Sequence, residues 1–112
     1  MSNVRLSAYQ VMWLFVMFDL PTVTKTDKKN AAKFRKDIEK DGFTMYQFSV
    51  YYRFCASTES VDVHIRRIKK IIPLFGKISI LTITDKQYSN IINIWGKEEK
   101  KNQLQPIQLE FF

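Results

Sequence analysis

Asp19 is the residue of this sequence with the clearest capacity for chemistry. It follows a continuous apolar run, Val11 to Phe18, and Leu20-Pro21-Thr22 comes directly after it. Such a run is typical of a strand buried on both faces at the centre of a sheet, and Pro21 stops strand pairing just beyond it. We expect a buried or half-buried carboxylate here, which needs a cation, a cluster of donors or a partner. The alternative is that Asp19 only caps the turn or accepts backbone N–H bonds.

Magnesium is the metal that suits Asp19 if the chain hydrolyses phosphodiesters, because Mg²⁺ prefers oxygen ligands and phosphate substrates. One aspartate supplies too few of the oxygen ligands that an octahedral ion needs. We therefore expect two copies of Asp19 to meet across a two-fold axis, with water and phosphate completing the site. Dimerisation is a requirement of this hydrolase hypothesis. Zinc spacings of Cys and His are absent from the sequence, and three glycines cannot build a glycine-rich phosphate loop.

Three other reactive side chains carry weaker signals. His64, the only histidine, flanks the apolar stripe of a predicted helix, which favours a packed or solvent-facing side chain over a catalytic base. Ser49 has no His or Lys close in sequence to activate it as a nucleophile. Cys55 is the only cysteine, so a disulfide framework and a thiolate metal cage are excluded. We expect a cytoplasmic protein without membrane contact, since no apolar run approaches the roughly 20 residues of a membrane span.

The net charge of +7 favours a polyanionic partner, and nucleic acid is the commonest one in the cytosol. Lysines recur at i, i+4, i+7 and i+11 on the first predicted helix, opposite its apolar positions. Such arrays bind phosphate backbones with strong salt dependence, and a plain solvated helix face is the alternative. The candidate nucleic-acid contacts are Lys25, Lys28, Lys29, Lys33, Lys36, Arg66 and Lys70.

The elements that position these residues begin with a helix after the first strand. Thr24 or Thr26 is expected to cap this helix, and Asp41-Gly42 to end it. Its predicted buried positions are Ala31, Phe34 and Ile38. Residues 43–55 are rich in aromatic and β-branched types and are predicted to be extended. We expect a sharp break near Gln47-Phe48-Ser49, although no Gly, Pro or Asn marks a turn there.

A second helix is predicted to open at Ser57-Thr58-Glu59-Ser60 and to end before Pro73. Its predicted buried stripe is Val61, Ile65, Ile68 and Ile72. A strand from Lys77 to Thr84 follows, and Asp85 is expected to cap a short helical turn. That turn is expected to run through Tyr88, Ile91 and Trp95. The order β-α-β-β-α-β is that of a ferredoxin-like α+β fold.

The domain organisation that follows has one folded unit and a tail. Residues 1–96 are predicted to form the ferredoxin-like domain, with 1–10 as a short extension, and 97–105 a polar linker. Residues 106–112 alternate as a strand whose initial proline suits a sheet edge. This strand can close its own sheet or join that of a partner subunit. Its candidate pairing residues are Ile107, Leu109 and Phe111.

Several motifs carry a resemblance to a known family. They are F-D-L-P-T, D-G-F-T-M-Y-Q-F-S-V-Y-Y-R, I-R-R-I-K-K-I-I-P and G-K-I-S-I-L-T-I-T-D-K-Q-Y. Together, over about residues 11 to 96, they resemble the small CRISPR-associated adaptation protein, the endoribonuclease-family dimer that partners the CRISPR integrase. The match is closest to the versions found in type II systems.

The resemblance implies a homodimer whose C-terminal strand joins the partner's sheet. It also implies a subunit that bridges two integrase dimers and holds short duplex DNA during spacer acquisition. Many members are described as Mg²⁺-dependent nucleases acting on RNA or DNA. The family's metal-binding aspartate corresponds to Asp19, and its basic residues after the first strand correspond loosely to Lys25, Lys28 and Lys29. Arg53 lies in the second matching motif and joins the candidate nucleic-acid contacts.

A single-stranded RNA-binding module of the RNA-recognition type is the competing hypothesis, because it shares this element order and stacks bases on exposed sheet aromatics. The aromatics available for that role are Tyr46, Phe48, Tyr51, Tyr52 and Phe54. The segment lacks the [KR]-G-[FY]-[GA]-F-V-x-[FY] signature of such modules. Aromatics buried at a two-fold interface favour the CRISPR hypothesis, and an exposed aromatic sheet on a monomer favours RNA recognition.

Overall fold

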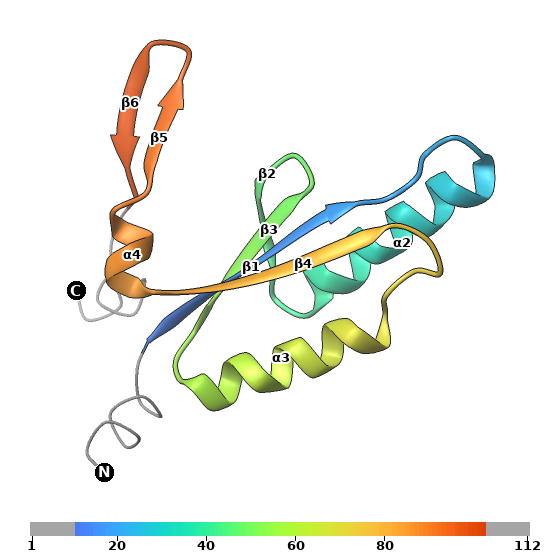
Figure 1. Ribbon diagram of the computed structural model, residues 1–112, viewed down its shortest axis with the longest axis horizontal. Helices are drawn as coiled ribbons and strands as arrows, with labels where there is room; N and C mark the ends of the chain where they lie inside the picture. Colours follow the sequence, from blue (N-terminus) through green and yellow to red (C-terminus); the bar gives the residue numbers. More distant parts are fainter. Residues whose placement is uncertain (1–10, 103–112) are drawn as a thin grey trace.

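A four-stranded antiparallel sheet organises the chain. The computed structural model describes residues 11–102, so the extension 1–10 and the predicted strand with Ile107, Leu109 and Phe111 lie outside the described residues. The strand order is β2-β3-β1-β4. The strands are β1 (Met12–Asp19), β2 (Thr44–Gln47), β3 (Val50–Cys55) and β4 (Lys77–Thr84). With two helices against one face of this sheet (Figure 1), the predicted ferredoxin-like α+β fold is confirmed.

Strand β1 lies at the centre of the sheet, as its unbroken apolar run predicts. It pairs with β3 along one edge and with β4 along the other. Leu14 and Val16 face the helices and are completely buried. Trp13 and Phe15 point to the opposite face, called the open face below, and are also buried. Burial on both faces explains why β1 shows no polar alternation.

The two long helices cover the face of the sheet opposite the open face, and most of their predicted apolar positions face the sheet. Helix α2 (Lys25–Lys40) begins at Thr24, whose side chain and that of Asp27 form a reciprocal capping box. Its buried residues are Ala31, Phe34 and Ile38, as expected. Helix α3 (Thr58–Lys70) begins at Ser57, whose hydroxyl accepts from the Ser60 N–H.

The predicted stripe of α3 is partly wrong. Val61 and Ile68 are buried and Ile65 packs against the core, but Ile72 lies beyond the helix end and is 47% exposed. The helix ends at Lys70, three residues before Pro73, so Ile72 does not continue the helical stripe. His64 takes the remaining inward position instead.

The predicted break between β2 and β3 is confirmed at Phe48 and Ser49. Ser49 adopts a left-handed backbone with φ of 64°, a region that glycine or asparagine usually occupies. The Phe18 N–H donates to the Ser49 carbonyl over 3.0 Å and ties the turn to β1. A serine held by this long-range bond explains why the turn has no local sequence signal.

An aromatic cluster closes one end of the open face. Helix α4 (Asp85–Ser89) places Tyr88 over Trp13, with ring centroids 3.8 Å apart. The expected role of Asp85 as the cap is wrong, because Thr84 caps α4. The Asp85 carboxylate instead accepts a 2.7 Å hydrogen bond from the Trp13 indole N–H. This contact fixes α4 against the sheet.

The segment after α4 differs from the prediction. The expected helical turn stops at Ser89, and a hairpin of β5 (Ile92–Trp95) and β6 (Glu98–Lys101) follows. The predicted linker 97–105 therefore contains a strand. The sequence of β6 shows no alternation of apolar and polar residues, because all of its side chains are exposed. Its pairing with β5 is made by backbone hydrogen bonds alone. Gly96, with φ of 61°, makes the turn.

Three polar side chains attach this hairpin to the sheet. The Tyr46 hydroxyl donates to Asn93 Oδ1 over 2.5 Å and accepts from Asn102 Nδ2 over 3.1 Å. Asn93 and Asn102 bond each other across the base of the hairpin over 2.6 Å. Figure 1 shows the hairpin projecting beyond the rest of the molecule, so these bonds carry much of its attachment. Between residues 11 and 102, no helix is long and apolar enough to cross a membrane.

We predict that Tyr46→Phe loosens the hairpin without unfolding the sheet. The substitution removes both hydrogen bonds of the hydroxyl, and a loss of about 1 to 2 kcal/mol should speed amide exchange of residues 92–101 by about five- to thirtyfold. Hydrogen exchange resolved by residue measures this effect. Tyr51→Phe is the matched control, because it removes a hydroxyl bonded to Glu39 on the other face of the sheet. Equal acceleration in both variants would contradict the attachment role of Tyr46.

Candidate functional site

Asp19 lies at the end of β1 on the open face of the sheet. It is exposed, so the expectation of a buried or half-buried carboxylate is wrong. On the open face the cover over β1 ends before Met17, which is 37% exposed, and Asp19 lies two residues beyond it. Asp19 lines a shallow groove between the β2–β3 turn and the start of β4. The groove is lined by Met17, Phe18, Asp19, Ser49, Val50, Lys77 and Ser79.

Two groove residues beside Asp19 were missed by the sequence reasoning. Lys77 pairs directly with Asp19 in the β1–β4 register, so both side chains lie on the open face. Ser49 reaches the groove from the other side, through the turn that is bonded to Phe18. Counting back from the ends of two adjacent antiparallel strands could have paired Asp19 with Lys77. No sequence signal could have placed Ser49, because its position depends on the left-handed turn.

A single chain does not supply a complete ligand set for Mg²⁺. Among residues 11–102, no group of three or more His, Cys, Asp or Glu side chains could hold a metal ion. Asp19 is the one carboxylate that lines the groove in the described part of the chain. An octahedral ion needs more oxygen ligands than this, so the residues present fit Mg²⁺ only if a second copy contributes.

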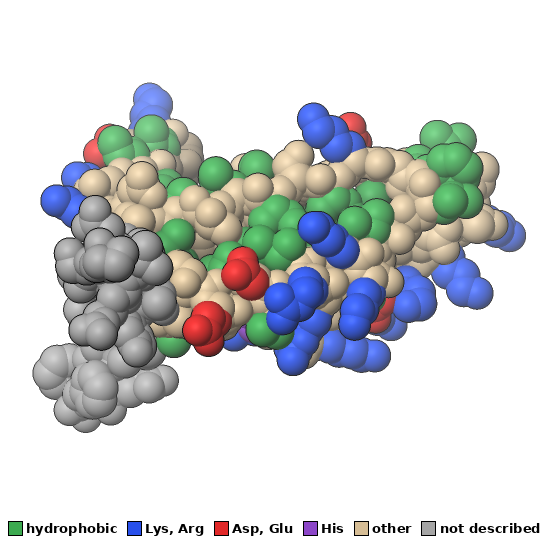
Figure 2. Space-filling model, turned by 60° about the horizontal axis from the view of Figure 1, so that its bottom comes forward, with side chains coloured by type: hydrophobic (Ala, Val, Ile, Leu, Met, Phe, Trp, Pro, Cys, Tyr) green, Lys and Arg blue, Asp and Glu red, His purple; other side chains and the backbone are tan. Residues whose placement is uncertain are grey.

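The predicted basic residues gather on the opposite side of the sheet. Figure 2 shows Lys and Arg side chains concentrated on the side that carries the helices. The exposed members from the prediction are Lys25, Lys28, Lys29, Lys33 and Lys36 on α2, and Arg66 and Lys70 on α3. Lys33 is partly neutralised by Asp37 at 2.8 Å. The structure therefore brings the lysines together with one another and not with Asp19.

A groove runs between the two basic helices. Its α2 side includes Lys33 and Lys40, and its α3 side includes Arg67 and Lys70. Asp37 and Asp41 also line this groove and pair with Lys33 and Arg67. The charges of Lys40 and Lys70 therefore contribute most of the field that attracts a polyanion such as a phosphate backbone. The helical side thus offers a broad cationic surface.

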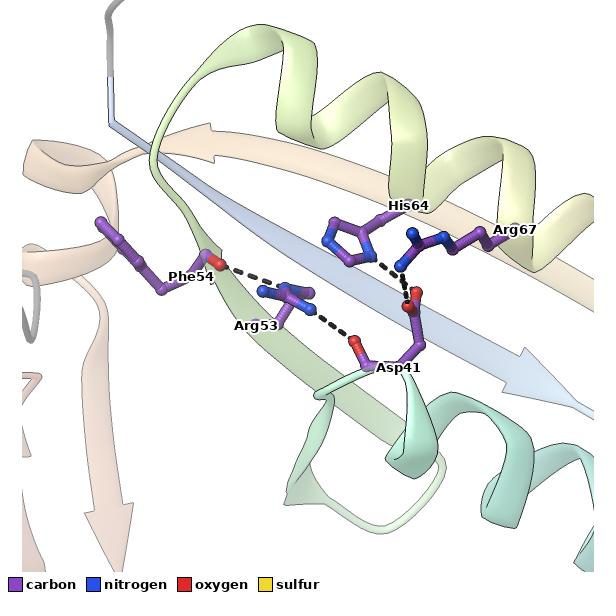
Figure 3. Close-up of polar contacts among 5 residues, drawn as sticks. All are labelled: Asp41, Arg53, Phe54, His64 and Arg67. Carbon is purple, nitrogen blue, oxygen red and sulfur yellow. Dashed lines mark hydrogen bonds and ion pairs between the residues drawn. The ribbon is translucent and has the colours of Figure 1, made fainter.

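Arg53 differs from the other predicted nucleic-acid contacts, because the protein itself engages its guanidinium. The Nε–H donates to the Phe54 carbonyl over 3.1 Å, and Nη1 donates to the Asp41 carbonyl (Figure 3). The guanidinium also lies 6.0 Å from the centroid of the Phe43 ring. These contacts give Arg53 a structural role, and its contact with nucleic acid stays an untested prediction.

Asp41 connects the end of α2 to helix α3. Its carboxylate oxygens lie 2.6 Å from His64 Nδ1 and 2.8 Å from Arg67 Nη1 (Figure 3). Together with the bond from Arg53 to its carbonyl, Asp41 joins α2, β3 and α3. Gly42 follows with φ of 88°, and a Cβ there would lie 2.6 Å from Arg53 Nη1. Of the two expected placements of His64, packed or solvent-facing, the structure shows the packed one, and its acidic partner was not foreseen.

The buried titratable groups support a structural interpretation of the core. Burial raises the pKa of the Cys55 thiol, which keeps it in the poorly nucleophilic protonated form. Burial also raises the pKa of Tyr51, and the nearby Glu39 carboxylate adds to this rise. Burial beneath the aromatic cluster raises the pKa of Tyr88 well above its usual range. None of these residues lines the groove at Asp19.

The strand order and the placement of two helices on one face define a ferredoxin-like α+β protein. Residues 12–91 match the family model of CRISPR associated protein Cas2, and the chain belongs to that family. It is 45% identical over 108 residues to the CRISPR-associated endoribonuclease Cas2 of Flavobacterium psychrophilum, a match covering 96% of this chain and 94% of that relative. It is 46% identical to the protein of that name from Parvibaculum lavamentivorans, over 90% of this chain and all of that relative.

A third relative matches the same share of the chain as the first. The CRISPR-associated endoribonuclease Cas2 of Paracidovorax avenae is 43% identical over 96% of this chain and 99% of its own length. The predicted resemblance to the CRISPR-associated endoribonuclease family is therefore confirmed. The family model includes Asp19, the basic helices and Lys77, so both surfaces described above lie within the matched residues.

We predict that Asp41→Ala destabilises the fold by about 2 kcal/mol, because it leaves buried His64 without its charged hydrogen-bond partner. Urea denaturation followed by circular dichroism measures the change. Asp37→Ala removes a similar carboxylate from the solvent-exposed pair with Lys33 and should cost less than about 0.5 kcal/mol. A loss for Asp37→Ala as large as that for Asp41→Ala would contradict the connecting role of Asp41.

Proposed function

We propose that this chain is a CRISPR adaptation subunit that acts as a homodimer, bridges dimers of the integrase and holds duplex DNA during spacer acquisition. The observation that carries the proposal is the cationic surface of α2 and α3 in a member of this family. Lysines on a helix bind phosphates as point charges, without the fork geometry that reads base edges. Such a surface suits the holding of DNA of any sequence.

The open face supports the proposed homodimer. Met17 and Leu81 lie on this face beside the groove and are 37% and 47% exposed. Two-fold pairing of this face would cover the same apolar side chains on both subunits. It would also bring the two Asp19 carboxylates toward one another. This arrangement leaves the basic helices on the outside of the dimer, where a duplex can reach them.

We further propose Mg²⁺-dependent phosphodiester cleavage, mainly of RNA, at the paired Asp19 residues. The two carboxylates would hold the metal, with water and phosphate oxygens as the remaining ligands. A bound Mg²⁺ supplies charge stabilisation to the phosphate and activates water. The carboxylates themselves orient the metal and keep it at the end of the two central strands. This activity and the holding of DNA use different faces of the subunit and can coexist.

The alternative function, an RNA-recognition-type module, receives less support from the open face. Trp13, Phe15 and Tyr88 are buried within one chain, and Tyr52 and Phe54 pack against them. A stacking platform needs exposed rings. Of the aromatic candidates from residue 46 to 54, Phe48 alone is strongly exposed, at 86%.

We predict that duplex DNA binding falls steeply with salt and depends on the helical lysines. Replacing Lys28, Lys29 and Lys36 together by Ala should reduce the slope of log K against log salt by about 2 to 3, since each lost phosphate contact contributes about 0.9. Fluorescence anisotropy over a salt series, with the integrase present and absent, measures this slope.

The matched control for the salt series replaces Lys97, Lys100 and Lys101, which lie at the hairpin and change the net charge equally. Its slope should stay close to that of the wild-type protein. Equal effects of the two triple substitutions, or a monomer that ignores duplex DNA and binds single-stranded RNA, would contradict the proposal.

We predict that Asp19→Ala abolishes metal-dependent cleavage and spares both dimer formation and duplex binding. The substitution removes the carboxylate from each subunit of the dimer, and the exposed position of Asp19 makes unfolding an improbable cause. Cleavage of labelled RNA in Mg²⁺ and size-exclusion chromatography test the two parts. If Asp19→Ala abolished spacer integration while the dimer stayed intact, the scaffold role could not be the main function of the protein.

A further inference from the structure

The loop between α3 and β4 exposes several large apolar side chains within a few residues. Its sequence from residue 71 to 76 is I-I-P-L-F-G. Leu74 is 85% exposed, Phe75 is 66% exposed, and Ile72 is also exposed. Domains that stay monomeric in water rarely expose such side chains side by side, and a patch of this kind marks an interaction surface. Neither cleavage at Asp19 nor phosphate binding by the helical lysines uses these side chains.

The conformation of this loop is fixed by its contact with the end of β1. Pro73 and Phe75 line a small cavity together with Leu20. A Cβ on Gly76 would lie 2.7 Å from Leu20 Cδ2 and 2.8 Å from the Asp19 carbonyl oxygen, so only glycine allows the loop to approach this closely. A loop that is already held in place loses little conformational entropy on binding. Its exposed apolar side chains are therefore suited to act as anchors for a partner.

A groove beside Leu74 adds a concave surface to the loop. It lies between α2 and the end of α3. Its apolar lining consists of Phe34, Ile71, Ile72, Pro73 and Leu74. Lys70 lines the same groove and forms no ion pair within residues 11–102, whereas Lys33 pairs there with Asp37. A flat bilayer surface cannot fill a concave groove, so its shape favours a protein with protruding side chains.

The charges beside the loop indicate the chemistry of the partner. Lys69 and Lys70 come directly before the loop, are exposed, and form no ion pair in the described part of the chain. A second copy at this surface would bring the same lysines against one another, and like charges disfavour that contact. A phosphate backbone would pair with the lysines and leave the apolar side chains in water. The complementary partner is a protein surface on which acidic side chains border an apolar pocket.

We propose that residues 72–75, with the adjoining end of the groove between α2 and α3, form the surface that contacts the integrase. Leu74 enters an apolar pocket of the integrase, and Lys70 pairs with an acidic side chain at the edge of that pocket. In a homodimer this surface occurs twice, as a bridge between two integrase dimers requires. The identity of the partner rests on the proposed function, and the chemistry of the contact rests on the loop.

Biolayer interferometry between the full chain and the purified integrase, without DNA, tests this contact. Leu74→Ala should weaken binding about tenfold or more, through faster dissociation, because it removes an apolar anchor. Lys70→Glu should weaken binding mainly through slower association, because it reverses a charge at the edge of the contact. Phe75→Ala should also weaken binding. Its thermal unfolding is measured in parallel, because the Phe75 ring also lines the cavity beside Leu20.

Val23→Ala and Lys36→Glu are the matched controls. Val23 is 87% exposed in the β1–α2 loop, Lys36 is exposed on α2, and neither lines the groove beside Leu74. Both substitutions should leave the affinity for the integrase unchanged. Leu74→Ala should leave duplex DNA binding unchanged, since leucine makes no phosphate contact. Equal losses in the controls, or wild-type affinity in both Leu74→Ala and Phe75→Ala, would overturn the proposal.

The same measurements separate this proposal from the proposed function. If the chain bound the integrase and neither loop variant changed the affinity, the contact surface would be overturned and the bridging role would stand. A chain that bound duplex DNA but no integrase would overturn the bridging role and this contact together.

Two other occupants of the loop have distinct signatures. Self-association that depends on concentration and is lost in Leu74→Ala would assign the loop to a second copy of the chain. Binding to vesicles of phosphatidylglycerol and phosphatidylcholine that is lost in Leu74→Ala would assign the loop to a membrane. Either result, with integrase binding unchanged in that variant, would overturn the proposed contact.

Discussion

The burial of strand β1 on both faces is the constraint on which the rest of the structure depends. Leu14 and Val16 require a covering layer on one side, and α2 and α3 provide it. Trp13 and Phe15 require one on the other side, and α4 provides it at one end only. Because α4 is short, the open face stays uncovered around Met17 and Asp19. The candidate acidic site is therefore located where the coverage of the central strand ends.

The two candidate surfaces are separated by the sheet itself. Helix residues that do not face the core carry the lysines, and the uncovered end of the sheet carries Asp19 and Lys77. A protein organised in this way can bind one polyanion without obstructing the other site. The Asp41 contacts matter to the first surface, because they join the end of α2 to α3 and hold the two basic helices in one arrangement.

Elements with strong periodicity could be predicted from the sequence, and elements fixed by distant contacts could not. Strand β1 and helix α2 follow from an apolar run and from the spacing of Ala31, Phe34 and Ile38. The hairpin after Ser89 was missed, because strand β6 has no apolar pattern and its attachment depends on Tyr46, far away in sequence.

The same limit applies to the candidate site. The position of Asp19 at the strand end and the exposure of the lysines were foreseeable from residue types and spacing. Its exposure was not, since it depends on how far α4 extends over the sheet. Asp19 also has a consequence for the alignment of the sheet. A slip of β1 by one residue would turn every side chain to the other face and would drive this carboxylate toward the apolar layer around Phe34. The desolvation cost of that charge raises the free energy of the misaligned sheet. Asp19, the proposed metal ligand, would therefore also favour the correct pairing of β1 with its neighbours during folding.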